Sequence, residues 1–282
     1  MASIEAPPLG RLSEDSISGC MALSAEAGWN QLADDWALFM RHGTVFGLPD
    51  AAGSPVATGA ILPYPDDFAW ISMVLVTASR RRARVGTRIL ETCCSELTRR
   101  GLVAVLDATP AGERVYRPLG FESIFPLSRW QGEGRDGRAA LPAGIRSMVP
   151  ADLANVAVAD AAAFGAKRNF LLESFFRRAP QLAFVTQAGD GFVLARPGRL
   201  AAQIGPLVAA DEDAAGALLS AALDSMGGPV FLDLCDRWEN LSRALQQRHF
   251  KVQRPFLRMA LRHRAPFGDP SRTFVVAGPE FG

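Results

Sequence analysis

Apolar positions in the first part of the chain change from helical to strand spacing. Residues 13–42 suit two short helices, and Leu32, Trp36 and Phe39 are spaced for one face of the second. Three apolar runs follow, separated by turns rich in proline, glycine and aspartate. These runs are predicted strands over residues 44–48, 56–62 and 68–76. The order of these elements predicts an α/β fold that opens with helices.

A long amphipathic helix is predicted over residues 85–100, because apolar side chains recur on one face and Gly101 stands where a helix stop belongs. A buried strand over residues 103–108 and a short helix over residues 112–119 come next. The polar residues 131–144 are then expected to form a linker.

The part of the chain beyond this linker repeats the same order of elements. Residues 120–130 align without a gap on residues 249–259, and residues 105–108 align on residues 231–234. These alignments match Phe121 with Phe250, Pro126 with Pro255, Arg129 with Arg258, and Asp107 with Asp233. A repeat of this length predicts two copies of one α/β fold.

Two domains are therefore expected, over residues 1–132 and residues 143–282. A chain of 282 residues is also about twice the usual size of a single domain.

Composition is that of an ordinary soluble globular protein, with 49% hydrophobic residues and a net charge of +1. A nearly neutral chain gives no general attraction to nucleic acid. We expect a cytoplasmic protein, because no signal peptide or membrane span is recognised in the sequence. The four cysteines form no CxxC pair, so neither a metal site nor a disulfide framework is expected.

Five arginines are concentrated just before and within the first turn of the predicted helix at residue 85: Arg80, Arg81, Arg82, Arg84 and Arg88. A helix start has unpaired N–H groups and a partial positive charge, which suits a phosphate. The equivalent junction of the second copy carries Asp211, Glu212 and Asp213 instead. The sequence therefore predicts that only the first copy holds a phosphorylated cofactor.

The basic junction resembles the Q/RxxGxG/A signature of the GNAT superfamily of acyl-CoA N-acyltransferases, with Arg81 at its first position and Gly86 at its last glycine. The resemblance implies that backbone N–H groups of this loop cradle the pyrophosphate of coenzyme A. Arg84 replaces the intermediate glycine. Because a Cβ atom disfavours positive φ, a right-handed conformation is expected at Arg84.

A second segment, YRPLGF at residues 116–121, resembles the GNAT segment in which a tyrosine faces the thioester sulfur. The resemblance makes Tyr116 the general acid, and it implies two GNAT-like domains in one chain. Each domain would be a mixed, mostly antiparallel sheet flanked by helices. The implied acyl-CoA contacts are Met73, Leu75, Val76, Arg81, Arg82, Ala83, Arg84, Val85, Gly86 and Thr87.

The general base is left open, because the strand WISMVLV at residues 70–76 has no carboxylate. A base or a water wire is needed, since an amine of pKa about 10.4 is almost fully protonated at pH 7. Asp66 and Asp67 could accept the proton, although their segment is more simply a turn. Asp107 suggests a structural role, and Asp160 could reach across from the second domain, although a helix surface is the favoured position.

The resemblance also places the acceptor beside the first helix pair, where Trp29, Asn30, Gln31 and Trp36 are found. Two tryptophans and an amide pair suit a small, partly apolar amine. The alternative is that both tryptophans belong to the core and that Asn30 caps the second helix.

The leading hypothesis is an N-acetyltransferase that uses acetyl-CoA and a small-molecule amine. The alternative is a non-catalytic acyl-CoA-binding or sensor protein, motivated by Arg84 and by the missing strand carboxylate. A nucleic-acid patch is disfavoured because no aromatic residues interleave with the arginines. The acceptor's identity and a homodimeric state both stay open.

Overall fold

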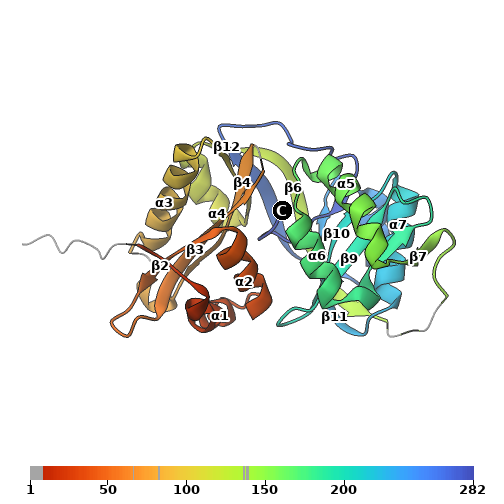
Figure 1. The fold of residues 1–282 in the computed structure, drawn as a ribbon, viewed down its shortest axis with the longest axis horizontal. Coiled ribbons are helices and arrows are strands. Elements are labelled where there is room, and N and C mark those ends of the chain that lie inside the picture. The colour runs from red at the N-terminus through yellow and green to blue at the C-terminus, as the bar shows by residue number, and fades with distance from the viewer. Residues whose placement is uncertain (1–8, 66, 82, 136, 138–139) are drawn as a thin grey trace, which may run out of the picture. The chain divides into compact units, whose positions relative to one another are not determined.

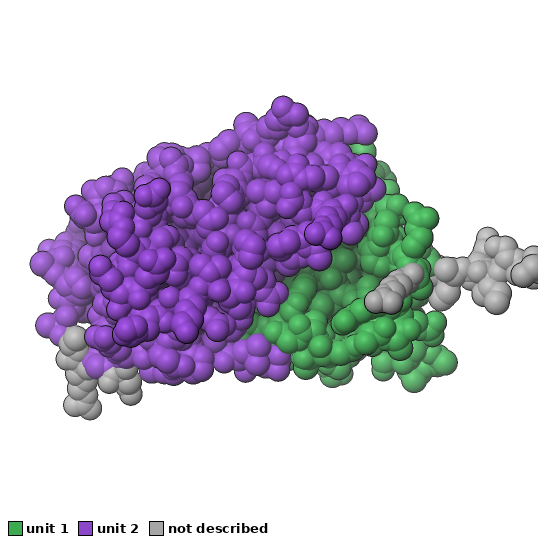
Figure 2. All heavy atoms as spheres, turned by 180° about the vertical axis from the view of Figure 1, so that it is seen from behind, with its two compact units in different colours: residues 1–63, 67–104 green, residues 64–66, 105–282 purple. Residues whose placement is uncertain are grey.

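The computed structural model describes residues 9–65, 67–81, 83–135, 137 and 140–282. These residues form two compact units, shown in green and purple in Figure 2. Unit 1 comprises residues 1–63 and 67–104, and unit 2 comprises residues 64–66 and 105–282. The units come from contacts between residues, so they do not have to coincide with the two sequence copies.

Unit 1 contains the strand order β1-β2-β3-β4 with helices around it (Figure 1). The expected pair of helices and the three strands after it are all present. The elements are β1 Gly10–Arg11, α1 Ile17–Glu26, α2 Ala33–His42, β2 Thr44–Pro49, β3 Pro55–Tyr64, β4 Phe68–Val76 and α3 Val85–Arg99.

Helix α3 packs on the sheet through the predicted apolar face. Ile89, Cys93 and Leu97 are wholly buried. A Cβ atom on Gly59 of β3 would meet the Ile89 side chain, so the missing side chain leaves room for the helix. This contact fixes α3, and with it the loop that precedes the helix, against the strands of unit 1.

Unit 2 has the strand order β5-β12-β6-β11-β13-β10-β9-β8-β7. Strands β10 and β11 run parallel, and the other neighbouring pairs of this unit are antiparallel, which confirms a mixed, mostly antiparallel sheet. The strands are β5 Val103–Ala108, β6 Phe121–Gly134, β7 Ile145–Ser147, β8 Phe184–Thr186, β9 Phe192–Arg196, β10 Ala202–Val208, β11 Gly228–Cys235, β12 Lys251–Leu261 and β13 Thr273–Val275. The helices are α4 Pro110–Tyr116, α5 Leu153–Phe164, α6 Asn169–Arg178, α7 Glu212–Asp224 and α8 Glu239–Gln247.

The two copies exchange their last long strand within unit 2. Strand β12 of the second copy pairs with β5 of the first, and β6 of the first copy pairs with β11 of the second. The two exchanged strands also pair with each other, with Leu127 opposite Phe256. The register is symmetric about this point, because Pro126 faces Leu257 and Ser128 faces Pro255.

Two buried ion pairs repeat this symmetry. Arg129 donates to Asp233 through Nε and Nη2, at 2.9 and 2.8 Å, and Arg258 donates to Asp107 in the same way, both at 2.9 Å. These four residues are the charged anchors of the sequence repeat. Each pair joins one copy to the other, and removing one partner from such a pair would leave an uncompensated buried charge.

The expected linker starts later than the sequence suggests. Residues 131–134 belong to β6, and their backbone pairs with residues 228–231 of β11. Gly132 also lacks the side chain that would meet the Phe250 ring. The local sequence of these polar and glycine-rich residues is typical of a loop. They form a strand because β11 of the second copy pairs with them.

In the described part of the chain, no helix is both long and apolar enough to cross a membrane.

Candidate functional site

The loop between β4 and α3 contains a strained residue. A 3-10 turn, Ala78–Arg80, follows the strand, and α3 begins at Val85. Arg84 precedes the helix with φ 55° and ψ 13°, which is left-handed. The right-handed conformation expected there is wrong: Arg84 adopts the backbone that glycine favours, at a cost of about 1–2 kcal/mol. Arg82 lies outside the described residues.

The starts of the two equivalent helices differ. At α3, no side chain of the described residues caps the helix start, and its first turn holds no acidic residue. At α7, Asp211 Oδ1 accepts a hydrogen bond from the Ala214 N–H at 2.8 Å. Unpaired N–H groups of a first turn are available to an anion. Helix α3 therefore offers donors, whereas Asp211 already occupies the start of α7.

A groove of about 490 Å³ opens beside the start of α3. Among the described residues that line it, Arg80, Arg84 and Arg88 outnumber the one acidic residue, Glu91. Such an excess of arginine favours an anionic ligand. Four of the predicted acyl-CoA contacts are among the lining residues: Ala83, Arg84, Val85 and Thr87.

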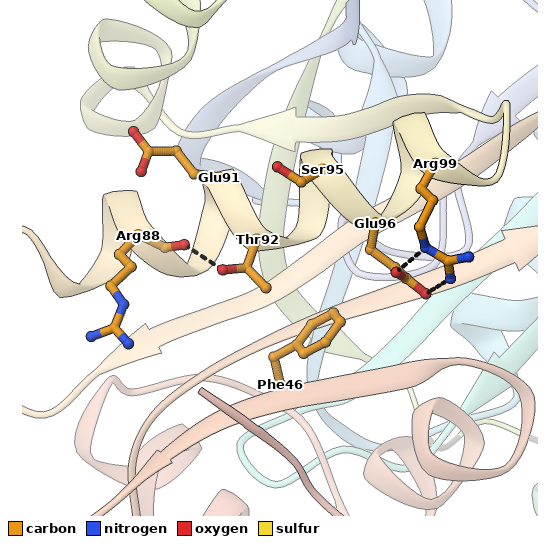
Figure 3. A pocket seen from close by; sticks show the side chains of 7 residues that line it. All are labelled: Phe46, Arg88, Glu91, Thr92, Ser95, Glu96 and Arg99. Atoms are coloured by element: carbon orange, nitrogen blue, oxygen red, sulfur yellow. Dashed lines mark hydrogen bonds and ion pairs between the residues drawn. The ribbon is translucent and has the colours of Figure 1, made fainter. Parts of the chain in front are cut away.

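A neighbouring groove of about 390 Å³ lies along α3, with Phe46 of β2 across from the helix (Figure 3). Its charges balance, because Arg88 and Arg99 oppose Glu91 and Glu96. Hydrogen bonds from the Arg99 and Arg100 side chains lower the pKa of Glu96 to about 2. The balanced charges give this second groove no preference for an anion.

Arg81 lies in a different network from the groove. Its Nε donates to the Val76 carbonyl at 3.1 Å, and its Nη2 is 4.0 Å from Glu26 Oε1. Glu26 also accepts from the Ala78 N–H at 2.6 Å and from Thr77 Oγ1 at 2.8 Å. Glu26 comes from the end of α1 and orders the start of the loop, and no motif in the sequence indicated it. No local pattern links residues 52 positions apart.

Strand β4 is irregular where the acyl-CoA arm is expected. Met73 has φ 54°, and its carbonyl accepts from the buried Thr58 hydroxyl at 2.9 Å. Strain of this kind is typical of functional sites. Ser72 Oγ, next to it, is buried without a hydrogen-bond partner among the described residues. Ser72 was not among the expected site residues, although a single polar residue in an apolar strand was a signal. The expected contacts Leu75 and Val76 lie at the end of the same strand.

Gly86 is positioned as the resemblance implies, within the first turn of α3. A Cβ atom there would lie 3.6 Å from Val76 Cγ2, an ordinary contact distance. Protein packing therefore does not require this glycine. Its lack of a side chain leaves the backbone open to a close approach by a ligand.

Tyr116 ends α4 and is half-buried, with its ring 5.8 Å from the Phe121 ring. Gly112, one turn earlier, lies beneath it: a Cβ atom there would be 2.9 Å from Tyr116 Cε2. The Thr109 hydroxyl caps this helix by accepting from the Gly112 N–H at 3.1 Å. The short helix therefore fixes the direction of the tyrosine ring.

The predicted acceptor residues differ in their exposure. Trp36 is wholly buried, and its ring N–H donates to Ser24 Oγ at 3.1 Å, which places it in the core. Asn30 does not cap α2; Leu32 precedes the helix, and Asp35 accepts from the Leu32 N–H at 2.8 Å. Gln31 Oε1 is buried without a partner among the described residues, whereas Trp29 is half-buried.

Two of the considered bases are bound to arginines. Asp107 pairs with Arg258, as a structural role requires. The expectation that Asp160 lies on a helix surface is wrong, because it is wholly buried and binds Arg168 at 2.8 and 2.9 Å. Asp67 is exposed, and Asp66 lies outside the described residues. Among the described residues, no group of three His, Cys, Asp or Glu is placed to hold a metal ion.

Comparison with known proteins identifies both copies. The acetyltransferase (GNAT) family model matches residues 15–121, and a second model, an acetyltransferase (GNAT) domain, matches residues 156–274. A crystal structure from Pyrococcus horikoshii, named as a candidate acetyltransferase, superimposes with a TM-score of 0.80 at 18% identity, covering 100% of this chain and 98% of that one.

Two curated relatives match most of the chain. The uncharacterized N-acetyltransferase YitH of Bacillus subtilis is 23% identical over 85% of this chain and 86% of its own length. The holothin acyltransferase of a Pseudoalteromonas species is 24% identical over 81% of this chain and 78% of its own length. The chain thus belongs to the GNAT acetyltransferases, as an acyl-CoA-dependent N-acyltransferase with two GNAT domains in tandem.

Proposed function

We propose that the chain transfers an acetyl group from acetyl-CoA to the amine of a small molecule. The cofactor binds only the first copy, residues 1–132, and the second copy, residues 143–282, is a degenerate GNAT domain. One observation carries this proposal: α3 begins without a side-chain cap beside Arg80, Arg84 and Arg88, whereas α7 is capped by Asp211. A diphosphate gains charge-assisted hydrogen bonds at the first helix and meets a carboxylate at the second.

The backbone of β4 binds the rest of the cofactor. Val76, whose carbonyl accepts a hydrogen bond from Arg81 Nε, offers its N–H to the pantetheine arm in this proposal. The irregular backbone at Met73 turns a peptide group out of the regular strand pattern. An N–H presented there would stabilise the negative charge that develops on the thioester oxygen.

The amine acceptor is held beside Gln31. Its buried Oε1 lacks a partner among the described residues, and leaving such an acceptor unpaired costs about 1–3 kcal/mol. An amine N–H satisfies it. The relative named a holothin acyltransferase supports a small-molecule acceptor. A water wire to solvent or the exposed Asp67 accepts the ammonium proton, since Asp107 and Asp160 are held in ion pairs.

Tyr116 protonates the departing thiolate of coenzyme A. Replacing Tyr116 with Phe removes this proton donor and should lower kcat by about 10²–10⁴-fold with little change in coenzyme A affinity. Gly112→Ala should lower kcat less, because its Cβ displaces the ring without removing the hydroxyl. An unchanged kcat in Tyr116→Phe would exclude the tyrosine as the acid.

The phosphate site is tested by the release of free thiol from acetyl-CoA in the presence of a library of small amines. Arg84→Glu, which reverses an arginine that lines the groove, should abolish both this release and coenzyme A binding in calorimetry, and Arg84→Gln should weaken both. Arg177→Glu, which reverses an exposed arginine on α6 of the second copy, is the matched control.

Full activity in Arg84→Glu would refute the assigned phosphate site. Tight coenzyme A binding with no turnover on any amine would instead favour a protein that only binds acyl-CoA. Activity on protein N-termini but not on small amines would overturn the acceptor class.

A further inference from the structure

Strands β10 and β11 of the second copy begin as neighbours and then separate. They pair in parallel from Ala202 with Val230 to Ile204 with Leu232. Beyond these residues β13 lies between them: Val275 faces Leu207 on one side and Leu234 on the other. Two further backbone hydrogen bonds, Ala209 N–H to Arg272 O at 3.2 Å and Val276 N–H to Asp233 O at 3.0 Å, extend this pairing. The cleft between the two strands is therefore filled by the chain itself.

The filled cleft is equivalent in sequence to the part of the first copy where the pantetheine arm is proposed to bind. Aligning the two strand-to-helix junctions matches Leu75 with Leu207 and Val76 with Val208. The backbone supports this match two residues before Leu75 and Leu207. Met73 and its counterpart Gly205 both have positive φ, 54° and 134°. The register of β10 also shifts between Ile204 and Leu207. Strands β4 and β10 are thus irregular at the equivalent position.

The residues that bind pantetheine in the first copy therefore have counterparts that bind protein in the second. Leu207 pairs with Val275, and Val208 pairs with Thr273. A Cβ atom on Gly205 would meet the Val276 carbonyl, so the segment passes directly over this glycine. Residues 272–282 are named here the closing segment. Its strand, Thr273–Val275, is extended between β10 and β11, and the segment ends in a turn at residues 279–281.

Side chains of the second copy hold the closing segment through its main chain. The Trp238 ring stacks on Phe274 at 4.1 Å, and its N–H donates to the Thr273 carbonyl at 2.8 Å. Arg196 Nη1 donates to the Ala277 carbonyl at 2.6 Å, and Arg168 Nη1 donates to the Gly282 carbonyl at 2.6 Å. Binding by main-chain pairing and anchored side chains is how a sheet recognises an added peptide strand.

Side-chain burial supports a tight fit. The buried hydrophobic residues of the segment are Phe274, Val275, Val276, Ala277 and Phe281. Arg196 also pairs with the buried Glu280 at 2.6 Å, so the charge within the segment is neutralised inside the cleft. An apolar, charge-neutralised cleft next to the acidic start of α7 suits a peptide and excludes a nucleotide diphosphate.

We propose that the cleft between β10 and β11 is a peptide-binding site and that the closing segment is its built-in ligand, in the place that the pantetheine arm takes in the first copy. The comparison with pantetheine rests on the proposed function. The occupation of the cleft by peptide does not.

The test cuts the chain ahead of the closing segment and leaves the segment in its cleft. The recognition sequence of a specific protease is inserted between the exposed Arg264 and Ala265 of the full chain. After cleavage, residues 265–282 should stay bound through size-exclusion chromatography. An added synthetic peptide of residues 265–282, carrying a fluorophore, should replace them, and a scrambled peptide should not. Departure of the fragment from a chain that keeps its circular dichroism and thermal transition would overturn the proposal.

A second variant probes the close contact at Gly205. Gly205→Ala should speed hydrogen exchange of the Val275 and Val276 amides about tenfold or more, because the new methyl group pushes against the Val276 carbonyl. Gly189→Ala is the control, since Gly189 also has positive φ, 77°, but would meet nothing within 4 Å. Equal exchange in both variants would contradict the proposal.

Coenzyme A titration distinguishes this proposal from the proposed function. Two equivalents bound per chain would overturn the occupied second cleft. No binding at all would overturn the cofactor site of the first copy, and the cleavage and exchange results would still decide the peptide site.

Discussion

The guanidinium group of Arg258 binds the carboxylate of Asp107 across 151 residues of sequence, with both hydrogen bonds at 2.9 Å. Arg129 and Asp233 form the equivalent pair in the opposite direction. Because each pair connects the two copies, the exchanged strands are tied to their partner strands by charge as well as by backbone pairing.

Breaking one of these ion pairs should strongly destabilise the folded chain. Asp107→Ala leaves the Arg258 guanidinium buried without its carboxylate, and it should lower the free energy of unfolding by about 3–5 kcal/mol in urea titration. Adding Arg258→Met in the same chain should restore much of the loss. The exposed pair of Arg41 with Glu14 serves as control, and Glu14→Ala should change little. A double variant no more stable than Asp107→Ala would contradict this account.

Gly86→Ala should separate folding from cofactor binding. Its Cβ has an ordinary contact with Val76, and alanine favours helix, so the free energy of unfolding should stay equal or rise by up to about 1 kcal/mol. Coenzyme A affinity should fall about tenfold or more, because the methyl group blocks the approach to the backbone. The control is Gly216→Ala in α7, whose Cβ would lie 3.7 Å from Leu241. Equal affinities in the two variants would remove the glycine from the binding site.

Replacing Arg84 should expose its backbone strain. Arg84→Gly relieves the left-handed conformation, whereas Arg84→Ala keeps the strain and removes the same charge. The glycine variant should therefore be about 1 kcal/mol more stable than the alanine variant in thermal or urea unfolding. Both should bind coenzyme A more weakly than the unsubstituted chain. If the alanine variant is as stable as the glycine variant, the strain at Arg84 is absent in solution.

Glu96 should contribute to the acid dependence of stability. Hydrogen bonds from Arg99 and Arg100 lower its folded-state pKa from 4.5 to about 2. A depressed carboxyl pKa stabilises the fold above the unfolded-state pKa, and the contribution disappears as the pH falls from about 4.5 to about 2. Glu96→Gln should flatten the decline of stability in this window, measured by urea unfolding at a series of pH values. An unchanged slope would show that the carboxylate is not held by its arginines.

Much of the fold could be predicted because the copies keep local patterns. The periodicity of residues 85–100 predicted α3, and the matched anchors predicted the repeat. The exchange of β6 and β12 could not be predicted. The local sequence of each strand fits pairing within its own copy as well as pairing with the other copy. Strand β13, at three residues, is too short to show a period.

The loop motif placed Gly86 at the start of a helix, and the structure has it in the first turn of α3. Its part in cofactor binding stays a prediction, and contacts between distant residues had no signature in the sequence. Glu26 was missed because it reaches the loop from another helix. The conformation of Arg84 was expected wrongly, because the rule that a Cβ atom disfavours positive φ does not hold at this position. Asp160 was misplaced because its partner, Arg168, lies beyond the end of its own helix.

The exchanged strands determine when the protein can fold during synthesis. Strand β5 obtains its β12 neighbour only after residues 257–260 have been made, about 150 residues later. Until then the ribosome carries a first copy whose sheet has an open edge, and such an edge invites pairing with other chains. The open edge is covered only when β12 has been made, so separate expression of the first copy should yield aggregates.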